Sequence, residues 1–167
     1  NDWDTLAAIS ADFSSRNLEI VDAAGAAGVS LCGTSDEVVP EAEKVLPANL
    51  CPLVKSTFGF AYSQKCPFTH FSDIIIAETT CDGKKKMYEL LNDLKETYVL
   101  HLPQGRDRSY EREAWYEECR LLKERLEDLY GITITDDDLR GAAARRNRLR
   151  AAKLAMYGLQ ACEPPVM

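Results

Sequence analysis

Short apolar runs alternate with amphipathic segments along the first 105 residues. The run DIIIAE at 73–78 has three isoleucines in a row, which is typical of a strand covered on both faces. Similar runs predict strands at 6–12, 28–32 and 98–102. This alternation predicts an α/β fold with a mostly parallel sheet of about four strands and helices on both faces.

Apolar residues recur at helical spacing between the strands. The pattern covers residues 15–24, 39–45, 52–62 and 84–95. Pro52 suits the first position of its helix, because a proline lacks the N–H that would have no partner there, and Cys51 would then be the cap. The side chains expected on the buried face of this helix are Leu53, Val54, Phe58 and Ala61.

The pattern changes after residue 105. Apolar positions then recur at intervals of 4, 3, 4 and 3 from Trp115 to Leu129, which predicts one long helix ending at Gly131. Thr135 or Asp136 is expected to cap a last helix that runs to about Tyr157. We therefore expect a core at 1–105 that carries the cysteine site and a helical extension at 106–167 packed on the same domain.

Composition and charge limit the function further. The chain has 167 residues, 46% of them hydrophobic, which is enough for one domain with a substantial core. Its formal net charge of −7 argues against nonspecific nucleic-acid binding. It contains neither an apolar run of about 18 residues nor a secretory leader, so we expect a cytoplasmic chain with no membrane contact. Because the first residue is Asn1 rather than Met, we expect part of the natural protein to lie outside this chain.

Three cysteines lie beside turn residues between positions 50 and 91. Cys51 and Cys66 each precede a proline, and Cys81 precedes an Asp-Gly pair. Cys32 and Cys81 would end strands and Cys51 would begin a helix. We therefore expect Cys32, Cys51 and Cys81 to lie at the carboxyl edge of the sheet, where parallel sheets usually bind their ligands.

Thiols at helix N-termini suit an anionic iron–sulfur cluster, because the helix end offers free N–H groups and partial positive charge. Cys51 and Cys81 have this setting, although both could instead be small buried hydrophobic side chains. The absence of a CxxC pair disfavours zinc. Cys32 is the third choice of ligand, Cys66 is expected to pack or to approach the site, and the other two cysteines, Cys119 and Cys162, are expected to be structural or exposed.

A family resemblance is carried by the segment ANLCPLVKSTFGFAYSQKCPFTHFSDIIIAETTCDGKKKMYELL, preceded by DAAGAAGVSLCG and followed by YVLHLPQ. The chain resembles the D-component family of 2-hydroxyglutaryl-CoA dehydratase, which is related to the subunits of benzoyl-CoA reductase. The likeness covers about residues 6–104 and is most specific in TTCDGKKK. It implies a two-lobed subunit in which each lobe is Rossmann-like and a [4Fe-4S] cluster lies between the lobes.

The resemblance also implies an activity, a cofactor and partners. The family removes water from a 2-hydroxyacyl-CoA by a radical reaction, which begins with one electron from an ATP-dependent iron–sulfur activator, and it acts with a sister subunit. Its first-lobe cluster ligands fall on Cys51 and Cys81, and a third thiolate comes from the second lobe. We expect this chain to be the N-terminal lobe and, by itself, to lack the cluster and be inactive.

Several charged residues have both a functional and an ordinary explanation. The run Lys84–Lys86 beside Cys81 would suit CoA phosphates or the activator, but a charged run is more often a solvated face, and the same holds for Arg145–Lys153. His101 would end a strand near the site and His70 is the other histidine. The acidic candidates for proton transfer are Glu41, Glu43 and Glu78.

Two alternatives to the dehydratase follow from the same residues. A benzoyl-CoA-reductase-like or double-cluster reductase subunit would share the cysteines and differ in substrate. A non-catalytic docking module, which would bind a partner through the basic last helix, is the alternative of another class.

Overall fold

The computed structural model describes residues 8–11, 18–105 and 107–164. Its four strands are β1 (Ala8–Ala11), β2 (Ala27–Ser30), β3 (Ile74–Glu78) and β4 (Thr97–Leu100), and they form one sheet in the order β2-β1-β3-β4. All neighbouring strands are parallel. The α/β class and the parallel sheet are therefore confirmed, as are the two long C-terminal helices.

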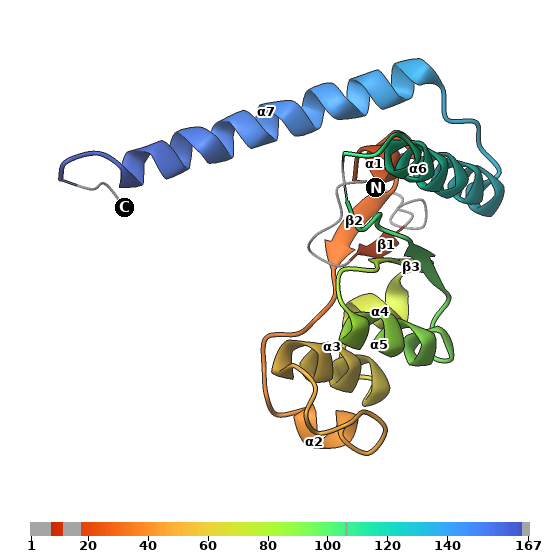
Figure 1. Cartoon of the computed structure of the whole chain (residues 1–167), viewed down its shortest axis with the longest axis vertical. Helices are drawn as coiled ribbons and strands as arrows, with labels where there is room; N and C mark the ends of the chain where they lie inside the picture. Colours follow the sequence, from red (N-terminus) through yellow and green to blue (C-terminus); the bar gives the residue numbers. More distant parts are fainter. Residues whose placement is uncertain (1–7, 12–17, 106, 165–167) are drawn as a thin grey trace.

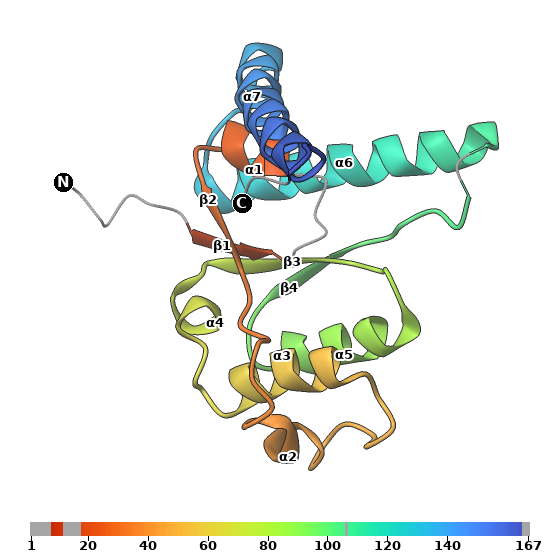
Figure 2. The ribbon, with the colours of Figure 1, turned by 90° about the vertical axis from the view of Figure 1, so that its left-hand side faces the viewer.

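Helices cover both faces of this sheet (Figure 2). One face carries α1 (Leu18–Ala23), α6 (Ser109–Tyr130) and α7 (Asp136–Gln160), and the other carries α2 (Val39–Ala42), α3 (Pro52–Tyr62), α4 (Pro67–Phe71) and α5 (Asp82–Asn92). The change of side after β2 follows from the strand order, because β1 to β2 runs one way along the sheet and β2 to β3 runs back past β1.

Strand β3 is buried along its whole length. Ile75 and Ala77 pack with Phe58 of α3 and Leu91 of α5. The alternate residues of β3, Ile74 and Ile76, belong to a second core with Leu122 and Leu126 of α6. The run of isoleucines is thus explained by two cores, because successive side chains of a strand point to opposite faces.

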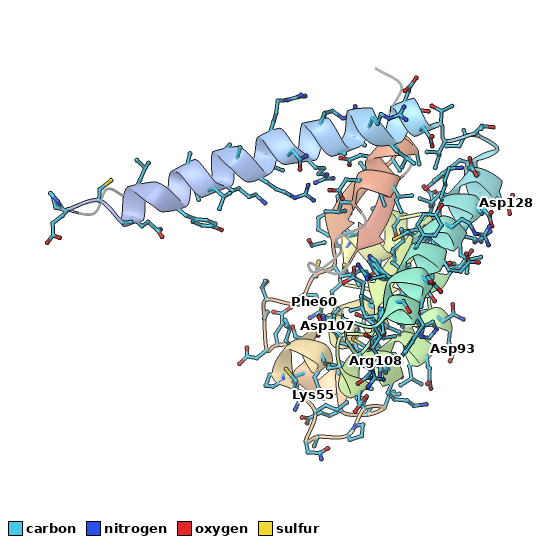
Figure 3. The ribbon with its side chains drawn as sticks, turned by 45° about the horizontal axis from the view of Figure 1, so that its top comes forward. Lys55, Phe60, Asp93, Asp107, Arg108 and Asp128 are labelled. Carbon is cyan, nitrogen blue, oxygen red and sulfur yellow. The ribbon has the colours of Figure 1, made fainter. Side chains whose placement is uncertain are left out.

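The loop between β2 and α3 is fixed closely against α3. A Cβ atom at Gly59 would lie 2.3 Å from the carbonyl oxygen of Val38, so only glycine allows the two segments to come this near. The Lys55 ammonium, labelled in Figure 3, donates to a Glu43 carboxylate oxygen at 2.6 Å and to the Ala48 carbonyl at 2.8 Å. These contacts position the start of α3.

Helices α6 and α7 follow the sequence pattern closely. Leu122 and Leu126 are fully buried, and Gly131 ends α6 in the left-handed conformation with φ of 62°. Thr135 caps α7, where its hydroxyl accepts the Asp138 N–H at 3.2 Å. Both predicted ends are confirmed.

Only the first part of α7 packs on the described part of the chain. The Arg146 guanidinium donates to both carboxylate oxygens of Asp22 in α1, at 2.6 and 2.5 Å, and Arg150 pairs with Glu19. Beyond these contacts α7 extends away from the sheet and its helices (Figure 1). Residues 147–160 are all exposed, including Leu154, Met156 and Tyr157.

The structure corrects several details of the prediction. Strand β2 ends at Ser30, so Cys32 follows the strand instead of ending it. Residues 6–7 and 12 of the first predicted strand and residues 15–17 of the first predicted helix lie outside the described residues. Helix α4 is absent from the sequence-based assignment, because five residues are too few to show a helical period. Helix α5 begins at Asp82, two residues earlier than predicted, since Cys81 is already its cap. Leu53, predicted to be buried, is 56% exposed. The division of the chain at residue 105 stays a prediction.

Candidate functional site

Cys51 and Cys81 are the N-caps of α3 and α5. The Cys81 sulfur accepts the Lys84 backbone N–H at 3.5 Å, whereas the Cys51 side chain makes no capping hydrogen bond. Both cysteines are exposed. The alternative that they are small buried hydrophobic side chains is therefore wrong.

The two helix starts that carry these thiols are in contact. A Cβ atom at Gly83, two residues after Cys81, would lie 3.3 Å from Leu50, the residue before Cys51, and 4.0 Å from Val54. Glycine at this position therefore lets the first turn of α5 pack against the chain entering α3. The contact brings the partial positive charges of two helix N-termini into one region.

The position of this region in the sheet matches that of ligand sites in other parallel sheets. Cys81 follows the carboxyl end of β3 by three residues. The strand order reverses between β1 and β3, and ligands of open parallel sheets bind at such a reversal, outside the carboxyl ends. This geometry is what the sequence led us to expect for Cys81.

Cys32 lies against Cys66 instead of forming a trio with the two exposed cysteines. Burial raises the pKa of Cys66, but hydrogen bonds from Thr69 and Cys32 outweigh it and leave the pKa below its ordinary value. Burial and the neighbouring Cys66 together raise the pKa of Cys32 to about 11. Cys66 is 2% exposed, so it packs as expected, and its sulfur caps α4 by accepting the Thr69 N–H at 3.4 Å.

The remaining cysteines agree with the ordinary explanation given to them. Cys119 is half-buried in α6, where burial raises its pKa. Cys162 is exposed after the end of α7, and its thiol donates to the Gly158 carbonyl at 3.6 Å.

Most other charged candidates form ion pairs at the surface or between helices. Lys85 pairs with Asp82 and Lys86 with Glu89 on the surface of α5. In the basic run of α7, Arg146 and Arg150 form ion pairs with acidic residues of α1. Part of this run therefore stabilises the packing of α7 on α1.

The acidic and histidine candidates differ in burial. Glu41 and Glu43 are held by lysines, whereas Glu78 is 3% exposed at the end of β3. His101 lies exposed after β4, and His70 is partnered by Phe71, the two rings being edge-on. None of these five residues lies on the first turns of α3 and α5.

Sequence reasoning missed a cavity of about 380 Å³ beside the two helix starts. Leu53 on α3 and Met87 on α5 are among its lining residues. The sequence signal for it is ambiguous, because a leucine that lines a cavity has the same helical spacing as one in a packed core.

Comparison with known proteins identifies the family. The model of the family described as "2-hydroxyglutaryl-CoA dehydratase, D-component" matches residues 16–167. The chain belongs to this family. The match includes both long C-terminal helices and so extends beyond the resemblance seen in the sequence.

Two curated relatives agree with membership of the D-component family. The chain is 48% identical over 149 residues to the "Putative dehydratase subunit YjiM" of Escherichia coli (strain K12), covering 89% of this chain and 39% of the relative. It is 27% identical over 150 residues to a benzoyl-CoA reductase subunit of Thauera aromatica, covering 87% of this chain and 38% of the relative. The chain thus spans about two fifths of the length of these relatives, which are both named as subunits.

The donor set at the helix starts fits an iron–sulfur cluster in part. Cysteine thiolates are the usual ligands of such clusters, and Cys51 and Cys81 are two exposed thiols on one region of the surface. Within residues 18–105 and 107–164, no three side chains of His, Cys, Asp or Glu form a group that could hold a metal ion. None of the described helices is long and apolar enough to cross a membrane.

Proposed function

We propose that this chain is the N-terminal lobe of a 2-hydroxyacyl-CoA dehydratase subunit, and that Cys51 and Cys81 are two ligands of a [4Fe-4S] cluster. For a chain that belongs to the dehydratase family, the cluster ligands, the cofactor and the reaction are what we propose here. A third thiolate would come from the second lobe of the longer protein. The sister subunit, the ATP-dependent activator and the CoA thioester are its proposed partners.

One observation carries this proposal: the two exposed thiols begin two helices that touch through Leu50 and Gly83. The first turns of two helices are therefore in contact, and the free N–H groups of a helix N-terminus favour bound negative charge. The Lys84 N–H already donates to the sulfur of Cys81. Backbone N–H groups can donate in the same way to the sulfur atoms of a bound cluster.

The protein residues and the cluster have separate tasks in this proposal. When bound, the cluster supplies an iron atom that polarises a carbonyl or hydroxyl oxygen and supports one-electron chemistry. Cys51 and Cys81 hold it at the carboxyl edge of the sheet. The Leu50–Gly83 contact fixes the distance between the two helix starts and therefore between the ligands.

A reductase remains the second enzyme candidate, because the chain is also similar to a benzoyl-CoA reductase subunit. The docking module is favoured less, since Arg146 and Arg150 of the basic helix are bound to α1. The dehydratase, the reductase and the docking module each predict a different outcome in the same assay.

The assay uses the full-length subunit, purified without oxygen together with its sister subunit. Activator, ATP and a reductant are added with either a 2-hydroxyacyl-CoA or benzoyl-CoA. The masses of the products are then measured by mass spectrometry. We expect loss of one water from the 2-hydroxyacyl-CoA. This loss should disappear in Cys51→Ser and Cys81→Ser and persist in Cys162→Ser, the matched exposed cysteine.

Other results would redirect the assignment. Gain of hydrogen by benzoyl-CoA, without dehydration, would assign the reductase. No turnover of either thioester, together with no iron in the purified protein, would reject both enzymes in favour of the docking module.

A further inference from the structure

The cavity beside the starts of α3 and α5 lies between three segments of the chain. Its wall is formed by the loop after β2, by α3 and by α5. Each helix contributes a first-turn residue, Leu53 or Lys84, and second-turn residues such as Thr57 and Met87. The cavity therefore runs from the cysteine end of both helices toward their second turns.

The lining is mostly apolar. The aliphatic and aromatic members are Leu31, Leu53, Val54, Met87 and Tyr88. Met87 and Tyr88 are 2% and 1% exposed, so the second-turn end of α5 is closed off from solvent. Leu53, in contrast, is 56% exposed, which places it where the cavity opens.

Gly33 brings the loop after β2 close against α3. A Cβ atom at this position would lie 2.6 Å from the Thr57 hydroxyl oxygen and 3.5 Å from a methyl carbon of Leu53. The loop after β2 therefore comes close to Thr57 and Leu53, two of the three α3 residues that line the cavity. At Gly33 this side of the cavity is formed by the backbone, and Leu31 and Thr34 of the same loop also line it.

We infer that this cavity binds the acyl side chain of a CoA thioester and prefers an apolar acyl group to one with a second carboxylate. The inference rests on the proposed function, because the reacting end of the thioester would then lie at Cys51 and Cys81. It goes further by naming the acyl class and the residues that select it.

Size and chemistry both support an apolar acyl group. A dry cavity of roughly 150 Å³ can take up benzene, so about 380 Å³ leaves room for a branched aliphatic or phenylalkyl group. A carboxylate among Leu31, Val54 and Met87 would lose its hydration without gaining a fixed cation, which is unfavourable. Lys84 belongs to the first turn of α5, at the cysteine end.

The test measures binding of thioesters that cannot react. Butyryl-CoA, hexanoyl-CoA and glutaryl-CoA lack the 2-hydroxyl group and are titrated calorimetrically into the full-length subunit with its sister subunit. Each buried methylene should strengthen binding roughly threefold to fourfold, so hexanoyl-CoA should bind about tenfold more tightly than butyryl-CoA. Glutaryl-CoA should bind more weakly than either.

Leu53→Trp should fill the opening of the cavity. The ratio of the dissociation constants of butyryl-CoA and hexanoyl-CoA, about ten in wild type, should then fall to about one. Because Leu53 is exposed, this change should leave the fold intact. The matched control is Leu121→Trp, at an exposed leucine of α6 on the other face of the sheet, and it should keep the preference.

The outcomes separate this inference from the proposed function. Equal binding of the three thioesters, or an undiminished hexanoyl preference in Leu53→Trp, would overturn the inference even if dehydration is observed. A hexanoyl preference lost only in Leu53→Trp would support the acyl site even if no dehydration is found. Absence of binding by all three thioesters would overturn both.

Discussion

At the scale of single residues, the six cysteines have different environments, and these differences set their chemistry. Cys51 and Cys81 are exposed at helix starts, whereas Cys66 is a buried free thiol at the start of a short helix and is hydrogen-bonded to Cys32. Exposure allows a metal or a reagent to reach a thiol, and burial prevents it. The proposed ligands are thus distinguished from the other cysteines by access as well as by sequence position.

Alkylation in the native state tests this distinction. With iodoacetamide at neutral pH, we expect Cys51, Cys81 and the exposed Cys162 to be modified first, as measured by mass spectrometry of peptides. Cys66 should react only after unfolding, because its low exposure outweighs its lowered pKa. Modification of Cys66 at the rate of Cys51 would show that Cys66 is not buried in the folded protein.

The raised pKa of Cys32 predicts a pH dependence of stability. The folded state disfavours its thiolate, so its contribution is complete below the ordinary pKa of 9.0 and is lost as the pH rises toward about 11. The melting-temperature advantage of wild type over Cys32→Ala should therefore shrink between pH 9 and 11. A constant difference across this interval would contradict the assignment.

At the scale of elements, close packing and a few ion pairs fix the helices on the sheet. Gly59 allows α3 to contact the Val38 backbone, and the paired Arg146 and Asp22 hold α7 to α1. The first contact supports the site directly, since α3 carries Cys51. The second holds the basic helix in place on the opposite face.

Substitution of Gly59 should be far more harmful than that of another helical glycine. Gly59→Ala would place its methyl group against the Val38 carbonyl and should lower the free energy of unfolding by about 1–3 kcal/mol. Gly158→Ala, where no atom lies within 4 Å, should be neutral or stabilise by up to about 1 kcal/mol. Urea unfolding measures both, and equal effects would argue against the close α2–α3 contact.

The Arg146–Asp22 pair should contribute more than an exposed pair on the same helix. Both of its side chains are about four-fifths buried and joined by two hydrogen bonds, so Arg146→Ala should cost about 1–2 kcal/mol. Arg140→Ala removes only solvent-exposed pairs and should cost less than about 0.5 kcal/mol. If the two variants unfold at the same urea concentration, α7 is not held to α1 by this pair.

The sequence predicted the elements well where the apolar repeat covers several turns and a proline or glycine marks the end of the element. The start of α3 at Pro52 and the end of α6 at Gly131 are signalled by residues that suit such positions. The three isoleucines likewise predicted the two-sided burial of β3. Helix α4 and the exposure of Leu53 were missed, because one is too short for a period and the other depends on a cavity between three distant segments.

At the scale of the whole molecule, the sheet brings together segments far apart in sequence. The chain entering α3 and the first turn of α5 meet at the carboxyl edge, and the apolar cavity continues from there between the two helices. The sequence predicted that Cys32, Cys51 and Cys81 would converge on this edge, but the structure places Cys32 against Cys66. The cluster role of Cys51 and Cys81 came from the family resemblance. The contact between the starts of α3 and α5 could be recognised only in the folded structure, because it joins segments about 30 residues apart in sequence.

The central claim is that Cys51 and Cys81 hold an iron–sulfur cluster, and its most direct test is the iron and acid-labile sulfide content of the full-length protein, purified without oxygen. The account predicts about four irons per subunit in wild type and in Cys162→Ser. It predicts marked loss in Cys51→Ser and in Cys81→Ser, with circular dichroism unchanged. Full iron and sulfide in both of these variants, or none in wild type after anaerobic reconstitution, would contradict it.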